Sequence, residues 1–303
     1  MKKIKKIKQD FAEGKISKND LINNLHDFHS ILFDYSKNLN DTQIKEIILK
    51  DNKVFFELNN HLLFNVDEFD KRTAGIESFN FNTYEPDLSD ILLKLSSQCE
   101  YIFDVGANIG WYSLHFSINK NTKIYSFEPI STIYEQLNSN VRLNKKENIN
   151  TFNIALSDNQ GDVEFFYDPK NATASSEKNI LDSDIKPVKC KQISLDLFMK
   201  NNEIKKIDLI KCDVEGAEIK VIKGGLNSIN LHKPIIFLEM LRKWSAKFGY
   251  HPNEIINLLR ELDYECYSVG KKISPIKVIN ESTIPTNFMF LNRVMHKSII
   301  DGI

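Results

Sequence analysis

The sequence predicts an α/β fold in which a mostly parallel sheet is covered by helices on both faces. From residue 101 onward, short apolar runs alternate with segments whose apolar residues recur every three or four positions. Continuous apolar runs of this kind are typical of strands buried on both faces of a parallel sheet. A glycine-rich turn also joins the first of these strands to a helix, as in parallel sheets that bind nucleotides.

The strands and helices of this part of the chain follow one another regularly. The expected strands, in chain order, are residues 101–105, 123–127, 149–155, 207–214, 234–240, 264–269 and 287–291. Helices are expected at 87–95, 111–118, 130–143 and 252–262, with another that ends near Gly224 and Gly225. Segments 163–167 and 188–194 interrupt the alternation, and we expect them to be antiparallel additions rather than part of a crossover unit.

The first 80 residues precede this alternation and are predicted to form an N-terminal extension, with the sheet domain at 81–303. Apolar residues at helical spacing predict two or three short helices up to about residue 49. The last of these helices would contain Ile44, Ile47 and Ile48. A small hairpin is expected at 54–66, with Asn59 and Asn60 in its turn because asparagine tolerates a positive φ.

The composition excludes several classes of function. The 40 Lys and Arg residues balance 41 Asp and Glu residues, so no overall field attracts nucleic acid or an anionic membrane. The four cysteines have no paired spacing, which argues against a zinc site and a disulfide framework and favours a reducing cytoplasm. No apolar run approaches the length of a membrane span. We therefore expect a cytoplasmic protein that acts on a small molecule, without a nucleic-acid partner.

The turn after the first strand has the sequence Asp104-Val-Gly106-Ala-Asn108-Ile-Gly110. Gly106 allows the turn to tighten and a ligand to approach the backbone, while Gly110 allows the helix to pack closely. A dinucleotide-binding turn would need glycine at Asn108 and Trp111, where there is none. The pattern thus disfavours a nicotinamide oxidoreductase.

The alternative ligand for such a turn is S-adenosylmethionine, which has no phosphate and carries a cationic amine and a sulfonium. An acidic Asp104 suits that ligand. Glu128 ends the next strand, at about the 20-residue distance from which a carboxylate reaches ribose hydroxyls. At the end of the third strand, Ala155 and Leu156 are expected to border an adenine ring, with Asp158 near its amino group. Glu85, which follows Tyr84 just ahead of the alternating strands and helices, would meet the amino group of the methionine moiety.

Several of these segments together resemble the FkbM-like methyltransferase family. The resemblance rests on DVGANIG, FEP, ALSDNQGDVEF, ISLDLF and above all LIKCDVEGAE, and it extends from about residue 85 to residue 291. Cys212 stands where an aliphatic residue is commoner in the family. The resemblance implies a Rossmann-like class I methyltransferase with a seven-stranded sheet whose last strand is antiparallel. It also implies S-adenosylmethionine as donor and O-methylation, frequently of sugars and natural products.

Methyl transfer to a sugar hydroxyl needs a positioned base, a metal or both, because the hydroxyl is a poor acid. Asp213 and Glu215 end the fourth strand, at the sheet edge that holds the cofactor, and Asp213 is also expected to contact the cofactor. Glu239 ends the fifth strand and could contact the acceptor or complete a divalent-metal site with Asp213. Alternatively, Asp213 and Glu215 could have only structural roles, in which they cap the next helix and pair with Lys211.

Other interpretations stay open at this point. Glu239 could instead pair with Arg242 or Lys243, and the polar loop 171–179, with Thr173, Ser175 and Ser176, could be an acceptor lid or an ordinary loop. The acceptor could be a non-sugar molecule methylated on oxygen or nitrogen, and the fold could serve as a non-catalytic scaffold. The N-terminal helices could form a homodimer.

Overall fold

The central sheet has eight strands in the order β13-β12-β14-β11-β10-β4-β5-β6. The structure, a computed structural model, describes residues 3–169, 175–180 and 185–303. The strands are β4 (Tyr101–Val105), β5 (Lys123–Phe127), β6 (Ile149–Phe152), β10 (Leu209–Cys212), β11 (Ile235–Glu239), β12 (Tyr264–Val269), β13 (Ser274–Pro275) and β14 (Asn287–Asn292). Strands β6, β5, β4, β10 and β11 are parallel, and β14 is antiparallel to both neighbours. The expected class I methyltransferase sheet is confirmed, with two-residue β13 as an addition at its edge.

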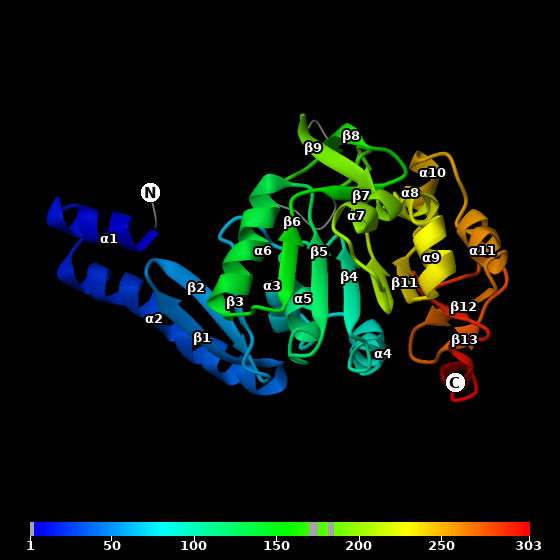
Figure 1. Cartoon of the computed structure of the whole chain (residues 1–303). Coiled ribbons are helices and arrows are strands. Elements are labelled where there is room, and N and C mark those ends of the chain that lie inside the picture. Colours follow the sequence, from blue (N-terminus) through cyan, green and yellow to red (C-terminus); the bar gives the residue numbers. More distant parts are fainter. Residues whose placement is uncertain (1–2, 170–174, 181–184) are drawn as a thin grey trace.

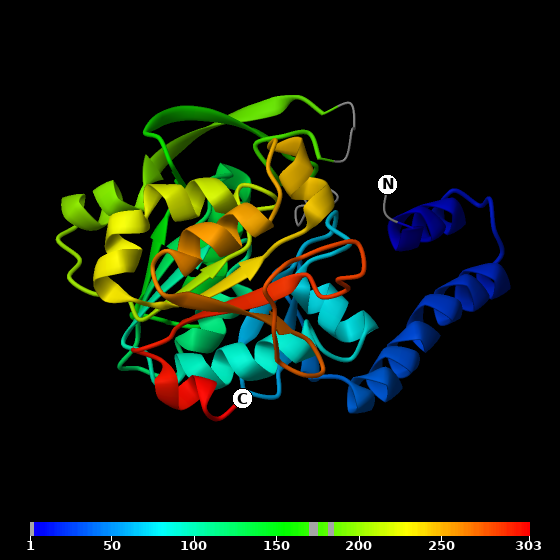
Figure 2. The same ribbon diagram turned by 90° about the vertical axis from the view of Figure 1, so that its right-hand side faces the viewer.

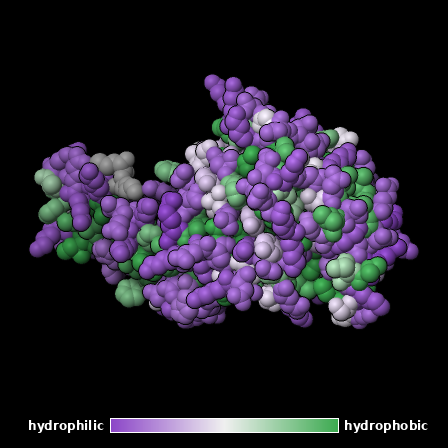
Figure 3. All heavy atoms as spheres, viewed as in Figure 1, coloured by the Kyte–Doolittle hydropathy of each residue, from purple (hydrophilic) through white to green (hydrophobic). Residues whose placement is uncertain are grey.

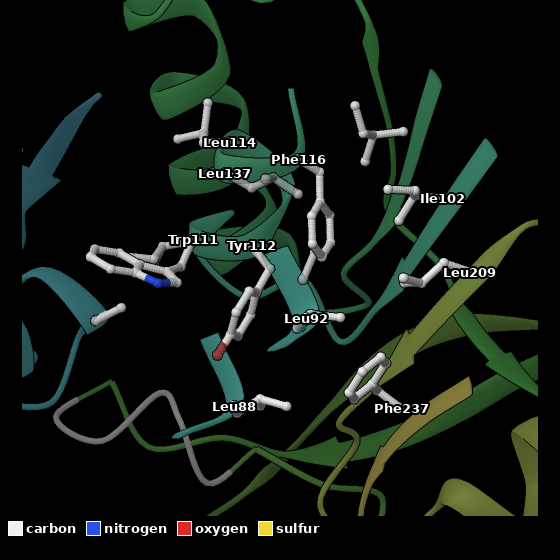
Figure 4. Close-up of a cluster of buried hydrophobic side chains, with 14 of the residues drawn as sticks. Leu88, Leu92, Ile102, Trp111, Tyr112, Leu114, Phe116, Leu137, Leu209 and Phe237 are labelled. Atoms are coloured by element: carbon white, nitrogen blue, oxygen red, sulfur yellow. The ribbon is translucent and has the colours of Figure 1, made fainter. Parts of the chain in front are cut away.

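Helices cover both faces of this sheet (Figures 1 and 2). They are α3 (Ala74–Asn80), α4 (Pro86–Ser96), α5 (Trp111–Phe116), α6 (Ser131–Leu143), α7 (Leu195–Asn201), α8 (Glu218–Gly224), α9 (Leu226–His232), α10 (Arg242–Lys247), α11 (Asn253–Arg260) and α12 (Lys297–Ile300). Adjacent strand residues point to opposite faces, so Ile102 packs with α4 and α5, and Phe103 packs with α7 and α8. Figure 4 shows the first of these clusters, in which Leu92, Trp111 and Leu137 converge.

A second, three-stranded sheet lies beside the carboxyl ends of the parallel strands (Figure 1). It contains β7 (Ala155–Ser157), β9 (Pro187–Ser194) and β8 (Gly161–Phe166), and the β8–β9 pair is antiparallel as expected. The single strand predicted at 149–155 is wrong, because β6 and β7 are separate strands in different sheets. A Cβ on Gly224 would lie 1.9 Å from the Ser157 carbonyl oxygen, so β7 packs tightly on α8 instead of extending the central sheet.

The N-terminal region contains α1 (Lys3–Ala12), α2 (Lys18–Asn38), a short 3₁₀ turn η1 (Leu39–Asp41) and the sheet β1 (Ile44–Lys50), β2 (Lys53–Leu58) and β3 (Leu63–Val66). The helix predicted through Ile44, Ile47 and Ile48 is wrong, because these residues form β1. Their spacing fits a helical stripe, but β-branched side chains favour strands.

The turns of this small sheet also differ from the prediction. Asp51 and Asn52, with φ of 52° and 59°, join β1 to β2 in a two-residue hairpin turn. In the β2–β3 turn the residue with positive φ is His61, at 66°, and not Asn59 or Asn60. The predicted hairpin at 54–66 is therefore part of a three-stranded sheet.

The small sheet is joined to the central one by a shared hydrophobic cluster. Phe56 and Phe64 lie in the cluster that contains Trp111, and the ring centroids of Phe64 and Trp111 are 4.9 Å apart. Helices α1 and α2, in contrast, contribute no buried residue and extend away from the body (Figures 1 and 2). A domain boundary at residue 80 stays a prediction. Among the described residues, no helix combines the length and the apolar character that crossing a bilayer requires.

Candidate active site

A cleft of about 760 Å³ opens at the carboxyl ends of β4, β5, β10 and β11. This is the point where the strand order reverses, since the chain proceeds outward from β4 through β5 and later returns to β10 on the other side. Loops that follow neighbouring parallel strands meet there. The volume lies in the range of cofactor and small-molecule pockets.

The loop after β4 presents bare backbone to this cleft. Gly106 has a φ of 77°, and a Cβ at this position would lie 1.9 Å from the Asp213 carbonyl oxygen. The backbone N–H groups of Gly106 and Ala107 both donate to the Phe127 carbonyl, which fixes the loop on β5. Gly106 and Asn108 line the cleft, as expected for cofactor-binding residues.

Gly110 lies behind the cleft and has a packing role. It precedes α5 with a φ of 87°, and a Cβ there would lie 2.5 Å from Leu137 Cδ1 on α6. The glycine thus brings α5 close to α6, rather than to the strand or to a ligand.

Glu128 lies buried at the end of β5 and lines the cleft. Its Oε2 accepts the Asn108 N–H at 3.1 Å and its Oε1 accepts the Ile130 N–H at 2.9 Å. Burial raises the pKa of Glu128 to about 7, against the lowering effect of these two backbone donors. Each carboxylate oxygen can accept a second hydrogen bond, so the residue is positioned to bind a pair of hydroxyls.

Asp104 does not line the cleft, in contrast to its expected role as a direct ligand of the cofactor. It is 1% exposed, and its Oδ2 accepts a hydrogen bond of 2.5 Å from Ser113 Oγ. Burial raises its pKa, and the Lys211 ammonium opposes that effect. Its Oδ1 has no hydrogen-bond partner in the described part of the chain. Asp104 therefore acts from behind the cleft, as a neighbour of Lys211.

The apolar end of the cleft is formed by Ile130, Ile154, Ala155, Leu156 and Phe165. Ala155 and Leu156 are where the sequence prediction placed them. Asp158 is exposed and does not line the cleft, because its carboxylate turns back to Ser157 and Asn159. The expected contact of Asp158 with an adenine amino group is thus not supported.

Three carboxylates gather at the other end of the cleft. The side-chain oxygens of Asp213, Glu215 and Glu239 lie within 4.8 Å of one another. Burial, followed by the charge of Asp213, raises the pKa of Glu215 to about 9 and that of Glu239 to about 10. Carboxylates this close cannot all ionise without a compensating cation. Such a group of oxygen atoms could also hold a divalent metal ion.

Lys211 supplies the cation that this cluster needs. Its Nζ lies 3.2 Å from Asp213 Oδ2 and 5.3 Å from the centroid of the Tyr112 ring. Burial disfavours its charged form, but Asp213, Asp104 and Glu85 outweigh that effect and raise the pKa of Lys211. The predicted pairing of Asp213 with Lys211 is therefore present, and Asp213 also lines the cleft. Of the three carboxylates, Asp213 is the one that forms an ion pair with Lys211.

Glu239 does not form the ion pair with Arg242 or Lys243 that the sequence left open as its structural role. Within the described residues, no ion pair joins it to Arg242 or Lys243, and its nearest hydroxyl is that of Thr286 at 3.5 Å. It lies open to the cleft beside Asp213.

Tyr84 and Glu85 line the cleft next to this cluster, as expected. Glu85 Oε2 accepts a hydrogen bond of 2.6 Å from the Tyr112 hydroxyl. Burial and the charge of Asp213 raise the pKa of Glu85. Tyr84 packs edge-on against Trp111, with ring centroids 5.2 Å apart.

Three residues that line the cleft have left-handed backbone conformations. Glu85, Asn108 and Glu215 have φ angles of 43°, 48° and 52°, although none of them is glycine. Such conformations cost free energy and persist only where the surroundings enforce them, which is common at functional sites. Buried Glu218 enforces one of them, because its Oε1 accepts the N–H groups of Val214 and Gly216 on both sides of Glu215.

Some residues of the cleft were not singled out from the sequence. Tyr112 follows the glycine turn directly, so its place on the first turn of α5 could have been used to find it. Trp244 lies on α10, which begins soon after Glu239 at the end of β11, so its closeness in the chain to that sheet edge could have been used to find it. Of the polar loop, Ser175 lines the cleft and Ser176 donates to the Glu215 carbonyl, while Asn171 and Thr173 lie outside the described residues.

The model of the FkbM methyltransferase domain matches residues 104–266, more than half of the chain. The chain belongs to the FkbM methyltransferase family. It is therefore an S-adenosylmethionine-dependent methyltransferase. The interpretation as a non-catalytic scaffold is not retained, because the family is one of methyltransferases.

Among curated relatives, the hexuronic acid methyltransferase AglP of Haloferax volcanii is 27% identical over 177 residues, which span 58% of this chain and 68% of that protein. Methyltransferase sdnD of Sordaria araneosa is 30% identical over 154 residues, 41% of this chain and 60% of that protein. A solved FkbM methyltransferase from Methylobacillus flagellatus is 16% identical, and the alignment covers 74% of this chain and 55% of that chain at a TM-score of 0.41.

Proposed function

We propose that the chain methylates a hydroxyl group of a sugar, a glycan precursor or a glycosylated metabolite. The observation that carries this proposal is the cluster of Asp213, Glu215 and Glu239 at one end of the cleft, with the Lys211 ammonium behind it. Carboxylates in this arrangement can accept a proton from a hydroxyl and can also bind the neighbouring hydroxyls of the same sugar. The similarity to the hexuronic acid methyltransferase AglP adds support.

The described residues fit S-adenosylmethionine in the rest of the cleft. Gly106 lets the cofactor loop pack directly against Asp213, because any side chain there would collide with the Asp213 carbonyl. Glu128 would bind the ribose hydroxyls with its free acceptor positions, and Ala155 and Leu156 would border the adenine. Glu85 is the carboxylate positioned for the amino group of the methionine moiety. When bound, the cofactor supplies an electrophilic methyl group.

The chain's own contribution to the reaction is to orient the acceptor and to remove its proton. Asp213 is the proton acceptor in this proposal, because Lys211 keeps the negative charge of the cluster on its carboxylate. Glu215 and Glu239 have raised pKa values, so they are protonated at neutral pH and can donate hydrogen bonds to acceptor oxygens. A base held at hydrogen-bond distance from the acceptor contributes typically ~100-fold to ~10,000-fold in rate.

The surroundings of the cluster favour a polar acceptor over a lipid-like one. Arg72 and Glu77 line this end of the cleft and form an ion pair of 3.0 Å, and Lys243 lies beside them. Trp244 provides a flat aromatic face of the kind on which sugar rings commonly pack. A polyketide or lipid acceptor would bring apolar surface against these charged groups and displace their water without replacing its hydrogen bonds.

The test is a methyl-transfer assay that measures S-adenosylhomocysteine release with a panel of nucleotide sugars, free hexoses, hexuronic acids and phenolic alcohols. We expect turnover with a sugar, and a fall of at least ~100-fold in kcat for Asp213→Asn without a comparable change in cofactor affinity. Asp90→Asn, at an exposed position on α4 that does not line the cleft, is the matched control and should retain most of the activity. Turnover with the phenolic alcohols alone would contradict the sugar proposal, and full activity of Asp213→Asn would contradict the role of Asp213.

A further inference from the structure

Helices α1 and α2 form an arm that extends from the body of the molecule (Figures 1 and 2). The two helices contact each other, and an open groove lined by Ile4 on α1 and Phe28 on α2 runs between them. Neither helix contains a buried residue, although α2 is 21 residues long. In proteins, most of the stability of a helix comes from packing of its apolar face. The arm as it stands has packed only a small part of its apolar surface.

The sequence of α2 has the pattern of a helix that packs along its whole length. Leu21, Leu25, Phe28, Leu32 and Tyr35 follow one another in alternating steps of four and three residues, which is the spacing of a coiled-coil seam. Helix α1 accompanies only the first part of this seam, because it has 10 residues. At the other end, Tyr35 stacks on Phe79 of the body, with ring centroids 5.2 Å apart. The middle of the seam has no such cover among the described residues.

The uncovered middle of α2 is strongly apolar. Leu32 is 57% exposed, and its neighbours Ile31 and Phe33 are 46% and 68% exposed. Ile4, Phe11 and Ile22 elsewhere on the arm are also exposed. Figure 3 shows hydrophobic side chains among hydrophilic ones on this part of the surface. Isolated exposed apolar residues are ordinary, but three in succession on a helix without a buried residue indicate a protein interface.

The charges of the arm indicate which partner covers it. Helix α1 is basic, with Lys3, Lys5, Lys6 and Lys8. Helix α2 carries acidic residues seven positions apart, which places them along one side: Asp20, Asp27 and Asp34. Within the described residues, no ion pair joins these lysines to these aspartates. Each copy of the chain therefore presents a basic helix and an acidic stripe, and the same surface is its own complement, as a two-fold interface requires.

We propose that the arm is the interface between two copies of this chain, in which the apolar middle of one α2 packs against the arm of the other copy and the lysines of α1 face the aspartates of the partner's α2. An anionic lipid surface is disfavoured as the occupant, because the acidic stripe of α2 would be repelled by it. The proposal does not depend on the acceptor of the methyl-transfer reaction.

The experiment is sedimentation equilibrium of the full chain over a wide concentration range, at low and high salt. We expect a dimer with twice the 35.1 kDa mass of one chain, weakened by salt. Leu32→Asp should weaken self-association by at least ~30-fold. Ile284→Asp is the matched control, since Ile284 is 90% exposed but lies far along the chain from the arm, and it should remain a dimer. Phe33→Asp provides a second variant, and circular dichroism with cofactor titration shows whether each variant is folded.

A monomer at all concentrations would overturn the proposal. A dimer that withstands both Leu32→Asp and Phe33→Asp would also overturn it, because the interface would then lie elsewhere. Flotation with vesicles of phosphatidylcholine and phosphatidylserine is the third measurement: binding of a monomeric wild-type chain, lost in Leu32→Asp, would identify a lipid surface as the occupant and refute the dimer.

Discussion

The cofactor loop has two reasons for a glycine at position 106, its positive φ and its close contact with the Asp213 carbonyl, and substitution by alanine should distinguish them. The residue has a φ of 77°, which costs a side-chain-bearing residue about 1–2 kcal/mol. In addition, the new Cβ would lie 1.9 Å from the Asp213 carbonyl oxygen. An ordinary contact of about 3.3 Å requires a relative shift of about 1.4 Å in backbone that carries both the cofactor loop and Asp213. Displacements of that size in a binding site reduce its performance by roughly 100-fold.

The matched control is Gly249→Ala. Gly249 has the same φ of 77°, but among the described residues no neighbouring atom lies within 4 Å of the position that its Cβ would take. Urea unfolding should show a loss of about 1–2 kcal/mol for this control, and calorimetric titration should show unchanged affinity for S-adenosylhomocysteine. Gly106→Ala should lose more stability and bind roughly 100-fold more weakly. If Gly106→Ala binds the ligand as tightly as Gly249→Ala does, the close contact with Asp213 does not shape the cofactor site.

Three further predictions concern the carboxylate cluster and the attachment of the small sheet. The pKa values of Glu215 and Glu239 are raised to about 9 and about 10 in the fold, so the stability linked to their protonation is complete below the unfolded value of 4.5 and is lost as pH rises through the folded values. Urea unfolding at several pH values should therefore show that the free energy of unfolding of Glu239→Gln falls less than that of the wild type as the pH rises. An unchanged dependence on pH would contradict the raised pKa of Glu239. Lys211→Met should lower the free energy of unfolding in urea by about 3 kcal/mol, because it removes the cation that pairs with Asp213. An unchanged free energy of unfolding would contradict this pairing. Phe64→Ala should cost ~3–5 kcal/mol in a single cooperative transition, and two separate transitions would show that the small sheet unfolds independently.

The carboxylate cluster illustrates how far sequence reasoning reaches in this protein. Asp213, Glu215 and Glu239 were predicted at one edge because the carboxyl ends of neighbouring parallel strands meet there, and the structure places their oxygens within 4.8 Å. Their raised pKa values could not be predicted, because burial and mutual distance depend on packing. Asp104 shows the opposite case. The motif identified it as a ligand of the cofactor, but in the structure it lies buried outside the cleft lining, where it accepts a hydrogen bond from Ser113 and neighbours Lys211.

Secondary structure was predicted best where hydrophobic pattern and residue preference agreed. The strands of the central sheet met that condition, apart from the one expected at 149–155, because their apolar runs are rich in strand-forming residues. Ile44, Ile47 and Ile48 did not, because their spacing fits a helix while their branched side chains favour the strand β1. The division of the segment 149–157 into β6 and β7 was decided by the tight packing of β7 on α8 at Gly224, which no local pattern records.

By itself, the sequence determined the α/β class, the glycine turn, the identity of the cofactor and the sheet edge at which the cleft lies, because each depends on residue order and strand periodicity. Only the tertiary structure decided which of these residues face the cleft, which carboxylates keep their protons, and that Tyr112 and Trp244 line the cleft with them. The physical reason is that solvent exclusion and the distances between charges arise from contacts between segments far apart in the chain, so no local stretch of sequence specifies them.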